Sequence, residues 1–560
     1  MTGVEPRPEQ REPAPPRLAE ALSFCAALLI GLGQALWSSW SSQARVVAGG
    51  LGDARLHHYL LEHFWQWLRG AAPHGSLWSP PFFYPAPDAL AYSEPLFGSA
   101  LPYLAARSLG AAPVPAYVAW QAALLAFGLI AAVWAFRRAL GLPFWVAVAS
   151  GYVFAFSPLR LGDLSQPQLL GFGFGALAFG AVVAGYRNPS RARGYGSLAA
   201  ASLVAQLYCS FYLTFFWAIG FAALLAAVAL EPGLRARVLA MAASRRFLIL
   251  ALALGVALSA TPFLVHYLDS LQELGPRSWA TIERNWLPRW GDYLTPSDAA
   301  WLYAPGGRAE SAESARAGMS PGWVTLALAL VGLWGGGGER RIARRALLIL
   351  VVATLAIGNL SLWRGIYELV PGAEAVRAVG RVRLVQLFAW ALGAGWGLAR
   401  LGARSNLLAA VAAIALLGDQ LQAPGGSPWA QRLEACQALA TEVPATCDAL
   451  LFSPRLEGGG ATRRAELVGQ VDGMWIASLA AVPAINGHSG GAPRGWSFRH
   501  AAIRSHEDES RLERSLMELA AHEPPGVELC WLRSAPLDRD PARARDQLSL
   551  VRVTAPRGEE

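Results

Sequence analysis

Long apolar runs, separated by short segments that contain arginine, occupy most of the chain up to residue 422. A run of about 20 apolar residues is long enough to cross a bilayer as a helix, so this pattern predicts about eleven membrane spans. In approximate residue numbers the predicted spans are 18–40, 114–136, 144–156, 169–186, 198–213, 215–230, 247–265, 323–334, 346–360, 384–398 and 407–421. We therefore expect an all-α polytopic membrane domain over residues 18–422.

After the last predicted span, the apolar runs become shorter and the turn residues more frequent. Helices are predicted over residues 431–443 and 510–522, and strands over residues 449–452, 527–532 and 548–553. Helices that alternate with short apolar strands are typical of an α/β fold. Residues 423–560 are therefore expected to form a soluble α/β domain.

The segment between the first two spans, residues 41–113, contains two stretches that predict helices outside the bilayer core. In residues 53–69, helical spacing gathers one apolar stripe, made of Leu56, Leu60, Phe64, Trp67 and Leu68. The opposite face is polar and consists of Arg55, His58, Glu62, Gln66 and Arg69. This pattern predicts a helix that lies in the membrane–water interface. Residues 96–109 are too short to span comfortably and predict a second interfacial or re-entrant helix.

The arginine residues predict how the chain is oriented. The doublets and triplets between spans fall on one predicted side, the side of residues 1–17. Because short cytoplasmic loops are enriched in positive charge, we place this side in the cytoplasm. Residues 1–17 are rich in proline, glutamate and arginine and are expected to be a disordered arm. The loops 41–113 and 266–321 and the domain 423–560 are then extracytoplasmic.

Composition agrees with a membrane protein and excludes several other classes. Hydrophobic residues make up 54% of the chain and charged residues only 15%, whereas soluble proteins carry about 25% charged residues. The net charge of +8 does not indicate a nucleic-acid partner, because the arginines lie in short clusters between apolar runs. The sequence also lacks the Walker A, HExxH and paired CxxC motifs.

Asp53 is the first candidate catalytic residue, because it places a carboxylate where the chain leaves the first span. One interpretation is a helix cap, in which the carboxylate accepts free backbone N–H groups. The other is a general base for sugar transfer, which deprotonates the acceptor hydroxyl while a lipid phosphate leaves. The two roles are compatible. His57 and His58 are candidate substrate-binding residues, and no metal site is predicted because no second ligand cluster accompanies Asp53 and His57.

Two further acids and an aromatic loop add to the candidate site. Asp163, the second candidate catalytic residue, follows Ser157-Pro158 in a short outer turn, where it could bind the acceptor, fix a catalytic arginine or merely cap a turn. Glu94 is a candidate substrate-binding acid near the same entrance. The tryptophans and tyrosines of residues 266–321 suit either sugar stacking or an interfacial aromatic belt.

Arg377, Arg381 and Arg383 fall on the predicted outer side, against the charge bias. Guanidinium groups at the outer surface can bind a lipid phosphate through two hydrogen bonds, or they can extend to lipid headgroups. We consider all three candidate phosphate-binding residues. Cys436 and Cys447 are the pair expected to form a disulfide in the oxidising compartment outside.

Several short motifs along the chain resemble a known family. They are Phe83-Tyr84-Pro85, Ala91-Tyr-Ser-Glu94, Phe154-Ala-Phe-Ser-Pro158 with Arg160, Gln168-Leu-Leu170, Val370-Pro-Gly372 with Arg377, and Asn486-Gly-His-Ser-Gly490. With the predicted architecture, these motifs resemble the polytopic GT-C glycosyltransferases, in particular bacterial members that use polyprenyl-phosphate sugars. The chain departs from that pattern at Asp163 and Gln166, where relatives often carry histidine, and at Val379-Gly380 before Arg381.

The resemblance implies a membrane glycosyltransferase of the bacterial inner membrane, with Asp53 as the acid of the first outer loop. It also implies a lipid-linked sugar donor, an envelope glycan, lipid or protein as acceptor, and Arg160 among the substrate-binding residues. No cofactor is expected, although a divalent cation stays open. The alternatives are a non-catalytic envelope assembly protein on the same scaffold and a lipid or polysaccharide transporter. A transporter predicts charges in mid-membrane and inverted repeats, and neither is evident.

Overall fold

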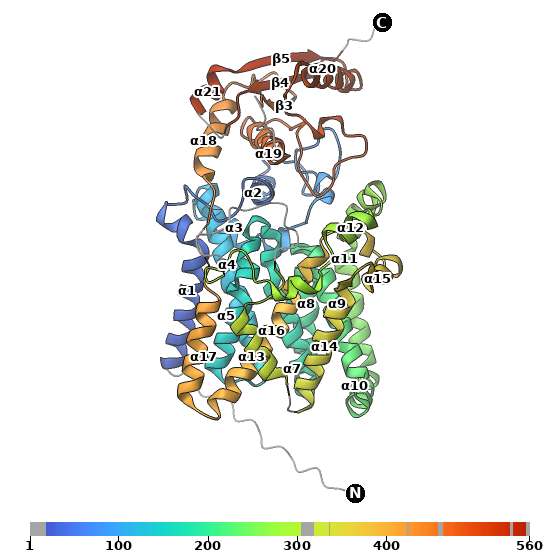
Figure 1. Ribbon diagram of the computed structural model, residues 1–560. Helices are drawn as coiled ribbons and strands as arrows, with labels where there is room; N and C mark the ends of the chain where they lie inside the picture. The colour runs from blue at the N-terminus through green and yellow to red at the C-terminus, as the bar shows by residue number, and fades with distance from the viewer. Residues whose placement is uncertain are drawn as a thin grey trace.

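The computed structural model describes residues 18–303, 318–334, 337–422, 425–456, 463–537 and 541–555. Figure 1 shows a tall bundle of helices with a smaller part stacked on one end, and that smaller part contains strands β3, β4 and β5. The predicted arm, residues 1–17, lies outside the described residues. We call the bundle the membrane domain and the smaller part the C-terminal domain.

Each predicted span coincides with a helix of the bundle. These helices are α1 (Leu18–Ser41), α4 (Pro113–Trp134), α5 (Phe144–Phe156), α7 (Gly173–Arg187), α8 (Ala192–Cys209), α9 (Phe211–Ala229), α11 (Arg246–Leu274), α13 (Trp323–Leu333), α14 (Gly338–Thr354), α16 (Arg383–Gly402) and α17 (Asn406–Asp419). Within the described residues, 7 helical segments are long and apolar enough to cross a membrane, and α13 and α17 are shorter apolar helices. The remaining two, α8 and α14, begin with turns that contain arginine, which lowers their hydropathy.

Short elements connect these helices. Those on the side of the C-terminal domain include α2 (Asp53–Leu68), η1 (Ala89–Tyr92), η2 (Phe97–Ser99), α3 (Leu101–Ser108), α6 (Pro158–Leu161), η4 (Gly162–Ser165), η5 (Pro167–Phe172), α12 (Trp279–Asn285), η7 (Trp290–Leu294), β1 (Ala356–Ile357), β2 (Leu360–Ser361), α15 (Trp363–Leu369), η8 (Ala373–Ala375) and η9 (Val379–Val382). At the opposite end, the π-turn η3 (Ala135–Ala139) extends α4, and η6 (Pro189–Arg191) and α10 (Pro232–Ser244) complete the surface.

The C-terminal domain has the predicted α/β character. Its elements are α18 (Trp429–Ala440), β3 (Ala449–Pro454), α19 (Arg463–Leu479), η11 (Ser497–Arg499), α20 (His506–Ala521), β4 (Glu528–Ser534), α21 (Pro541–Asp546) and β5 (Ser549–Thr554). The strand order is β3-β4-β5, with β3 parallel to β4 and β4 antiparallel to β5. The predicted fold class, an all-α membrane domain with a C-terminal α/β domain, is confirmed.

The predicted disulfide is wrong. Cys447 is bonded to Cys530, and Cys436 is a free, buried thiol. The parallel register of β3 and β4 places Leu450 opposite Cys530, so Cys447, just before β3, lies close to that cysteine. Cys436 instead faces α19 from α18, where its sulfur lies 3.9 Å from a carboxylate oxygen of Asp472. The pairing therefore depends on strand register, which the sequence spacing of the cysteines does not show.

One feature of α2 differs from the prediction. Its polar face is not exposed to water, because Arg55, His58 and Glu62 are all buried. Arg55 donates to Asp472 of α19 across 2.6 Å, and Glu62 accepts from Arg107 of α3 at 3.0 Å. The C-terminal domain thus covers the side of α2 that the sequence pattern predicts to face water. Helix α2 is a buried element between the two domains.

Candidate functional site

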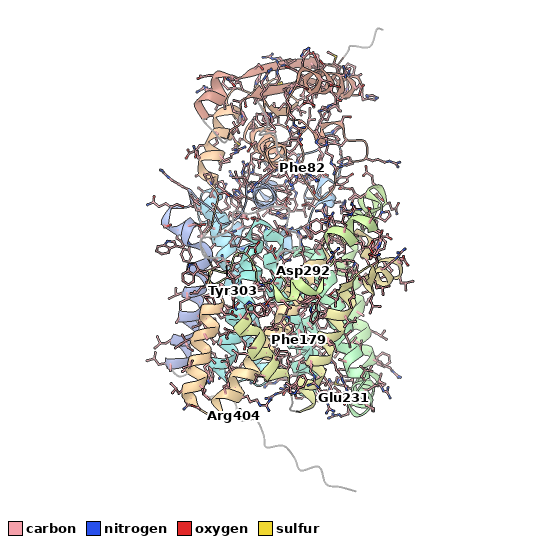
Figure 2. The ribbon with its side chains drawn as sticks, viewed as in Figure 1. Phe82, Phe179, Glu231, Asp292, Tyr303 and Arg404 are labelled. Atoms are coloured by element: carbon pink, nitrogen blue, oxygen red, sulfur yellow. A yellow bond between two sulfur atoms is a disulfide. The ribbon has the colours of Figure 1, made fainter. Side chains whose placement is uncertain are left out.

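Asp53 is the first residue of α2 and lies at the interface between the membrane domain and the C-terminal domain. Figure 2 marks this level of the molecule with Phe82, just below the C-terminal domain. The loop before α2 passes close to η4: Gly49 has a φ of +120°, and an added Cβ there would lie 2.8 Å from the Leu164 carbonyl oxygen. A glycine at position 49 therefore permits this approach, which places Asp53 beside the segment that carries Asp163 and Gln166.

The Asp53 carboxylate does not cap α2. No side-chain cap is present at the start of this helix, and His57 contacts the Asp53 backbone carbonyl instead, with 2.6 Å between Nδ1 and O. The carboxylate Oδ1 accepts a hydrogen bond of 2.8 Å from Nε2 of His488. Its Oδ2 has no hydrogen-bond partner within the described residues, and 40% of the side chain is exposed. Asp53 thus has one fixed oxygen and one accessible oxygen.

His488 is held in place from both sides of the interface. The Asn486 side chain accepts from the Phe452 N–H in β3 at 2.6 Å and donates to the Phe452 carbonyl at 2.9 Å. The Asn486 backbone carbonyl accepts from the Phe83 N–H at 3.1 Å. At the next position, an added Cβ on Gly487 would overlap the Phe83 ring. The segment that contains His488 is therefore packed tightly between β3 and the first outer loop. This packing points the His488 ring at Asp53.

Charge stabilises the ionised form of Asp53. Burial alone would raise its pKa, but the hydrogen bond from His488 and the positive charge of Arg381 act against burial, and the pKa falls to about 2. For His57, burial is the largest cause and lowers the pKa to about 4. At neutral pH, Asp53 is therefore a carboxylate and His57 a neutral imidazole.

Two of the three predicted arginines lie near this carboxylate without an acidic partner. Arg381 donates to the Gln166 side-chain oxygen, and its guanidinium lies 4.9 Å from the centre of the Tyr212 ring. Arg377 lies over Trp286 at 5.0 Å. Burial lowers the pKa of Arg377, and the negative charge of Asp53 acts in the opposite direction. Neither arginine forms an ion pair in the described part of the chain.

Glu94 is buried close to the same charge. Its carboxylate accepts from the Phe211 backbone N–H at 2.8 Å and from the Ser210 hydroxyl at 3.1 Å, which fixes the start of α9. Burial raises the pKa of Glu94 to about 7, while the positive charge of Arg381 acts to lower it. The charge of Arg381 thus acts on both Glu94 and Asp53.

Asp163 and Arg383 are engaged with each other. One guanidinium nitrogen of Arg383 lies 2.7 Å and 2.9 Å from the two Asp163 carboxylate oxygens, and both side chains are largely buried. Of the roles that the sequence leaves open, Asp163 therefore has that of fixing an arginine. Asp163 and Arg383 neutralise each other's charge. Arg377 and Arg381, in contrast, have no acidic partner among the described residues.

Arg160 and His58 have internal surroundings. Arg160 is 1% exposed, donates to the carbonyls of Phe154 and Leu384, and lies 3.5 Å from the Phe172 ring centre. His58 is 2% exposed and is enclosed by the rings of Tyr103, Tyr117, Trp429 and Trp475. Both residues are enclosed by protein, so neither is accessible to a substrate in this structure.

A small cavity adjoins His488 on the side of the C-terminal domain. It has a volume of about 120 Å³, and its lining includes Phe83, Gln470, His488, Trp496 and Arg499. Aromatic rings beside amide, imidazole and guanidinium groups are chemistry that suits a carbohydrate. His488 borders the cavity and donates to Asp53, so it connects the cavity to the candidate catalytic carboxylate.

One group of potential metal ligands occurs in the described residues, and it lies elsewhere. It consists of Cys447, Glu528 and Cys530. The two sulfurs form the disulfide, so they are not available as thiolate ligands.

His488, Tyr212 and Gln166 are the site residues that the sequence did not predict. His488 is 435 residues from Asp53 along the chain, so no helical or strand period connects them. The signal that could have identified it is Asn486-Gly-His-Ser-Gly490, a polar, glycine-bounded segment with a single histidine inside the C-terminal domain. Tyr212 lies in an apolar run, where the sequence predicts that an aromatic residue belongs to the hydrophobic core.

Comparison with known proteins identifies the fold. No protein-family profile and no curated protein matches the sequence. Among solved structures, the chain is similar to the arabinofuranosyltransferase AftD from Mycobacteria, with a TM-score of 0.50 and 16% identity over 96% of this chain. This chain spans 37% of the length of AftD.

A second similarity is to the archaeal oligosaccharyltransferase AglB from Archaeoglobus fulgidus. The complex of AglB with an inhibitory peptide and a dolichol-phosphate gives a TM-score of 0.50 and 14% identity, covering 92% of this chain and 69% of AglB. A second AglB structure, tethered to an acceptor peptide, gives a TM-score of 0.51 at 12% identity over the same shares. The chain therefore shares the GT-C fold of these two proteins.

Proposed function

We propose that this protein is a membrane glycosyltransferase. It transfers a sugar from a polyprenyl-phosphate-linked donor to a cell-envelope acceptor on the extracytoplasmic face of the bacterial inner membrane. The observation that carries the proposal is the convergence of an ionised, half-exposed Asp53, its partner His488 and two arginines without acidic partners at one domain interface. The GT-C fold of the chain and the lipid-linked chemistry of its structural neighbour support this assignment.

Asp53 is the general base of the proposed reaction. The acceptor hydroxyl donates to Oδ2, the carboxylate oxygen that His488 leaves available. As the acceptor oxygen bonds to the sugar C1, its proton passes to Asp53, and the bond between C1 and the phosphate oxygen breaks. The polyprenyl phosphate leaves with the electron pair of that bond. The low pKa of Asp53 keeps the group ionised before the proton arrives.

Arg377 and Arg381 bind the donor phosphate in this proposal. The two guanidinium groups carry positive charge beside the base but have no acidic partner within the described ion pairs. An incoming phosphodiester would supply the missing negative charge, and guanidinium groups bind phosphate oxygens through paired hydrogen bonds. Arg383 has the supporting role of ordering the neighbouring segment through Asp163.

The acceptor approaches from the C-terminal domain. The cavity beside His488 contains Trp496 and Gln470, which suit stacking and hydrogen bonding to a sugar ring. An acceptor in this position and a lipid donor at the arginines would meet at Asp53.

The test is sugar transfer from a radiolabelled polyprenyl donor, followed by thin-layer chromatography. Asp53→Asn removes the base but keeps the shape of the side chain, so we expect transfer to fall at least about 100-fold with normal membrane expression. The matched control is Asp88→Asn, an outer-loop acid that contacts His266 instead of the site. Near-normal transfer by Asp53→Asn would reject the role of Asp53. An absence of transfer by the wild type with any polyprenyl donor would favour the assembly-protein alternative.

A further inference from the structure

A large cavity lies at the end of the bundle opposite the C-terminal domain. It has a volume of about 2170 Å³ and is bordered by α1, α4, η3, α7, η6 and α10. Figure 2 marks this end of the molecule with Arg404 and Glu231. Pockets for small ligands hold about 300–1,000 Å³, so this cavity is large enough for a molecule with long chains.

The lining of this cavity combines positive charge with an apolar wall. Its six arginines come from several different elements and are Arg137, Arg138, Arg187, Arg191, Arg237 and Arg245. None of the described residues that line it is acidic. The apolar lining includes Phe24, Ile130, Val133 and Phe144. A site of this kind matches a ligand with an anionic head and an apolar body.

Several of these arginines already have partners within the protein. Arg137 lies 3.4 Å from Glu20 and Arg187 pairs with Glu339, which neutralises their charge, and Arg245 donates to the Pro189 carbonyl at 2.8 Å. The side chains of Arg138 and Arg191 are exposed and make no hydrogen bond or ion pair with the described part of the chain. These two arginines therefore hold charge that is available to an external anion.

We propose that this cavity binds an anionic phospholipid from the adjacent leaflet, with its phosphates on Arg138 and Arg191 and its acyl chains along the apolar wall. Basic pockets between membrane helices are suited to lipid headgroups of high negative charge. The size of the cavity and the two available arginines favour a lipid with two phosphodiesters over a lipid with one. The site is distinct from the candidate catalytic site, which lies at the other end of the bundle, and it does not depend on the proposed reaction.

The experiment uses the full chain, purified in detergent and stripped of lipid. Binding of diphosphatidylglycerol, phosphatidylcholine and inorganic phosphate is measured by native mass spectrometry and by the shift in unfolding temperature. Each arginine near a lipid phosphate contributes about five- to six-fold in affinity. We expect Arg138→Gln/Arg191→Gln to weaken diphosphatidylglycerol binding about thirty-fold. The charge-keeping variant Arg138→Lys/Arg191→Lys should retain most of the affinity.

The matched control is Arg404→Gln, which removes an exposed arginine from the same end of the molecule outside the cavity. This variant should bind diphosphatidylglycerol within about two-fold of the wild type. Three results would overturn the proposal. They are equal losses in Arg404→Gln and the double variant, equal binding of phosphatidylcholine, and equal stabilisation by inorganic phosphate. Because Arg138 and Arg191 are exposed, the double variant should unfold at the wild-type temperature when no lipid is added.

Discussion

The pKa of Asp53 depends on residues from two distant parts of the chain. Arg381 precedes α16, and His488 belongs to the C-terminal domain. Desolvation disfavours the charged carboxylate, and these neighbours act against that effect. The pKa and the position of Asp53 therefore depend on both domains.

The first prediction concerns His488 as a positioning residue. In His488→Leu, the carboxylate loses the hydrogen bond to Oδ1, which for a charged group is worth roughly 1.5–3 kcal/mol. We expect kcat to fall about ten- to a hundred-fold, with the KM of the donor little changed. The pKa of Asp53 should rise, so the acidic limb of the pH–rate profile should move to higher pH. His522→Leu, which replaces an exposed histidine at the end of α20, serves as the control. An unchanged pH profile would contradict the role.

At this scale the sequence predicted the site in part. Asp53, Arg377 and Arg381 stood out because their charge conflicts with an apolar or outward-facing context, and the structure brings them together. Arg160 and His58 carried the same signal, yet protein surrounds them. The difference depends on which residues the folded protein buries, and the identity of a polar residue does not show this.

Among the elements, α2 connects the two domains through buried charge. Asp472 of α19 is 1% exposed and lies 2.6 Å from a guanidinium nitrogen of both Arg55 and Arg432. The positive charges of Arg432 and Arg55, with their hydrogen bonds, outweigh burial and lower the pKa of Asp472. This group fixes α2, and therefore Asp53, against the C-terminal domain.

Asp472→Asn should be strongly destabilising, because it leaves two buried guanidinium groups without their counter-charge. Breaking a buried pair in this way costs about 3–5 kcal/mol. We expect a lower unfolding temperature and faster hydrogen exchange in α2. The control is Glu368→Gln, which breaks an exposed pair with Arg364 and should cost less than about 1 kcal/mol. Equal stability of the two variants would show that the buried group does not hold the domains together.

The histidines of α2 predict how stability depends on pH. Burial lowers the pKa of His58 to about 3 and that of His63 to about 3, whereas both protonate near 6.5 in an unfolded chain. Between pH 6.5 and about 3 the unfolded state binds more protons, so stability should fall as the pH falls through this window. At pH 5 each of these histidines should lower the free energy of unfolding by roughly 2 kcal/mol.

This effect is measured as the unfolding temperature between pH 7 and pH 4.5. His58→Phe should flatten the pH dependence, because the aromatic cage around His58 can hold a phenyl ring. His506→Gln, an exposed histidine at the start of α20, should leave the slope unchanged. A slope that is the same in His58→Phe and the wild type would contradict the assignment of the effect to α2.

The positions of the helices in the chain were more predictable than the residues that pack around them. Hydropathy located the membrane helices, because apolar length is a direct requirement of the bilayer. It did not show that the polar face of α2 is buried, because part of the cover comes from α18 and α19, almost 400 residues later in the chain. The disulfide was missed for the same reason, since the register of β3 and β4 decides which cysteines meet.

In the whole molecule, the C-terminal domain completes a site that the membrane domain begins. The segment before α16 supplies Arg377 and Arg381, the first outer loop supplies Asp53 and Glu94, and the C-terminal domain supplies His488 and the adjoining cavity. A lipid donor would reach the arginines from the bilayer, while an acceptor would enter from the C-terminal domain. The sequence predicted these two parts but not that their contact forms the site.

The most direct test separates donor binding from chemistry in steady-state kinetics with a polyprenyl-phosphate sugar. Asp53→Asn should lower kcat at least about 100-fold while the donor KM stays within about three-fold of the wild type. Arg381→Gln should raise the donor KM about ten-fold or more with a smaller effect on kcat. The account would be contradicted if Asp53→Asn kept its kcat, or if its loss appeared in the donor KM instead.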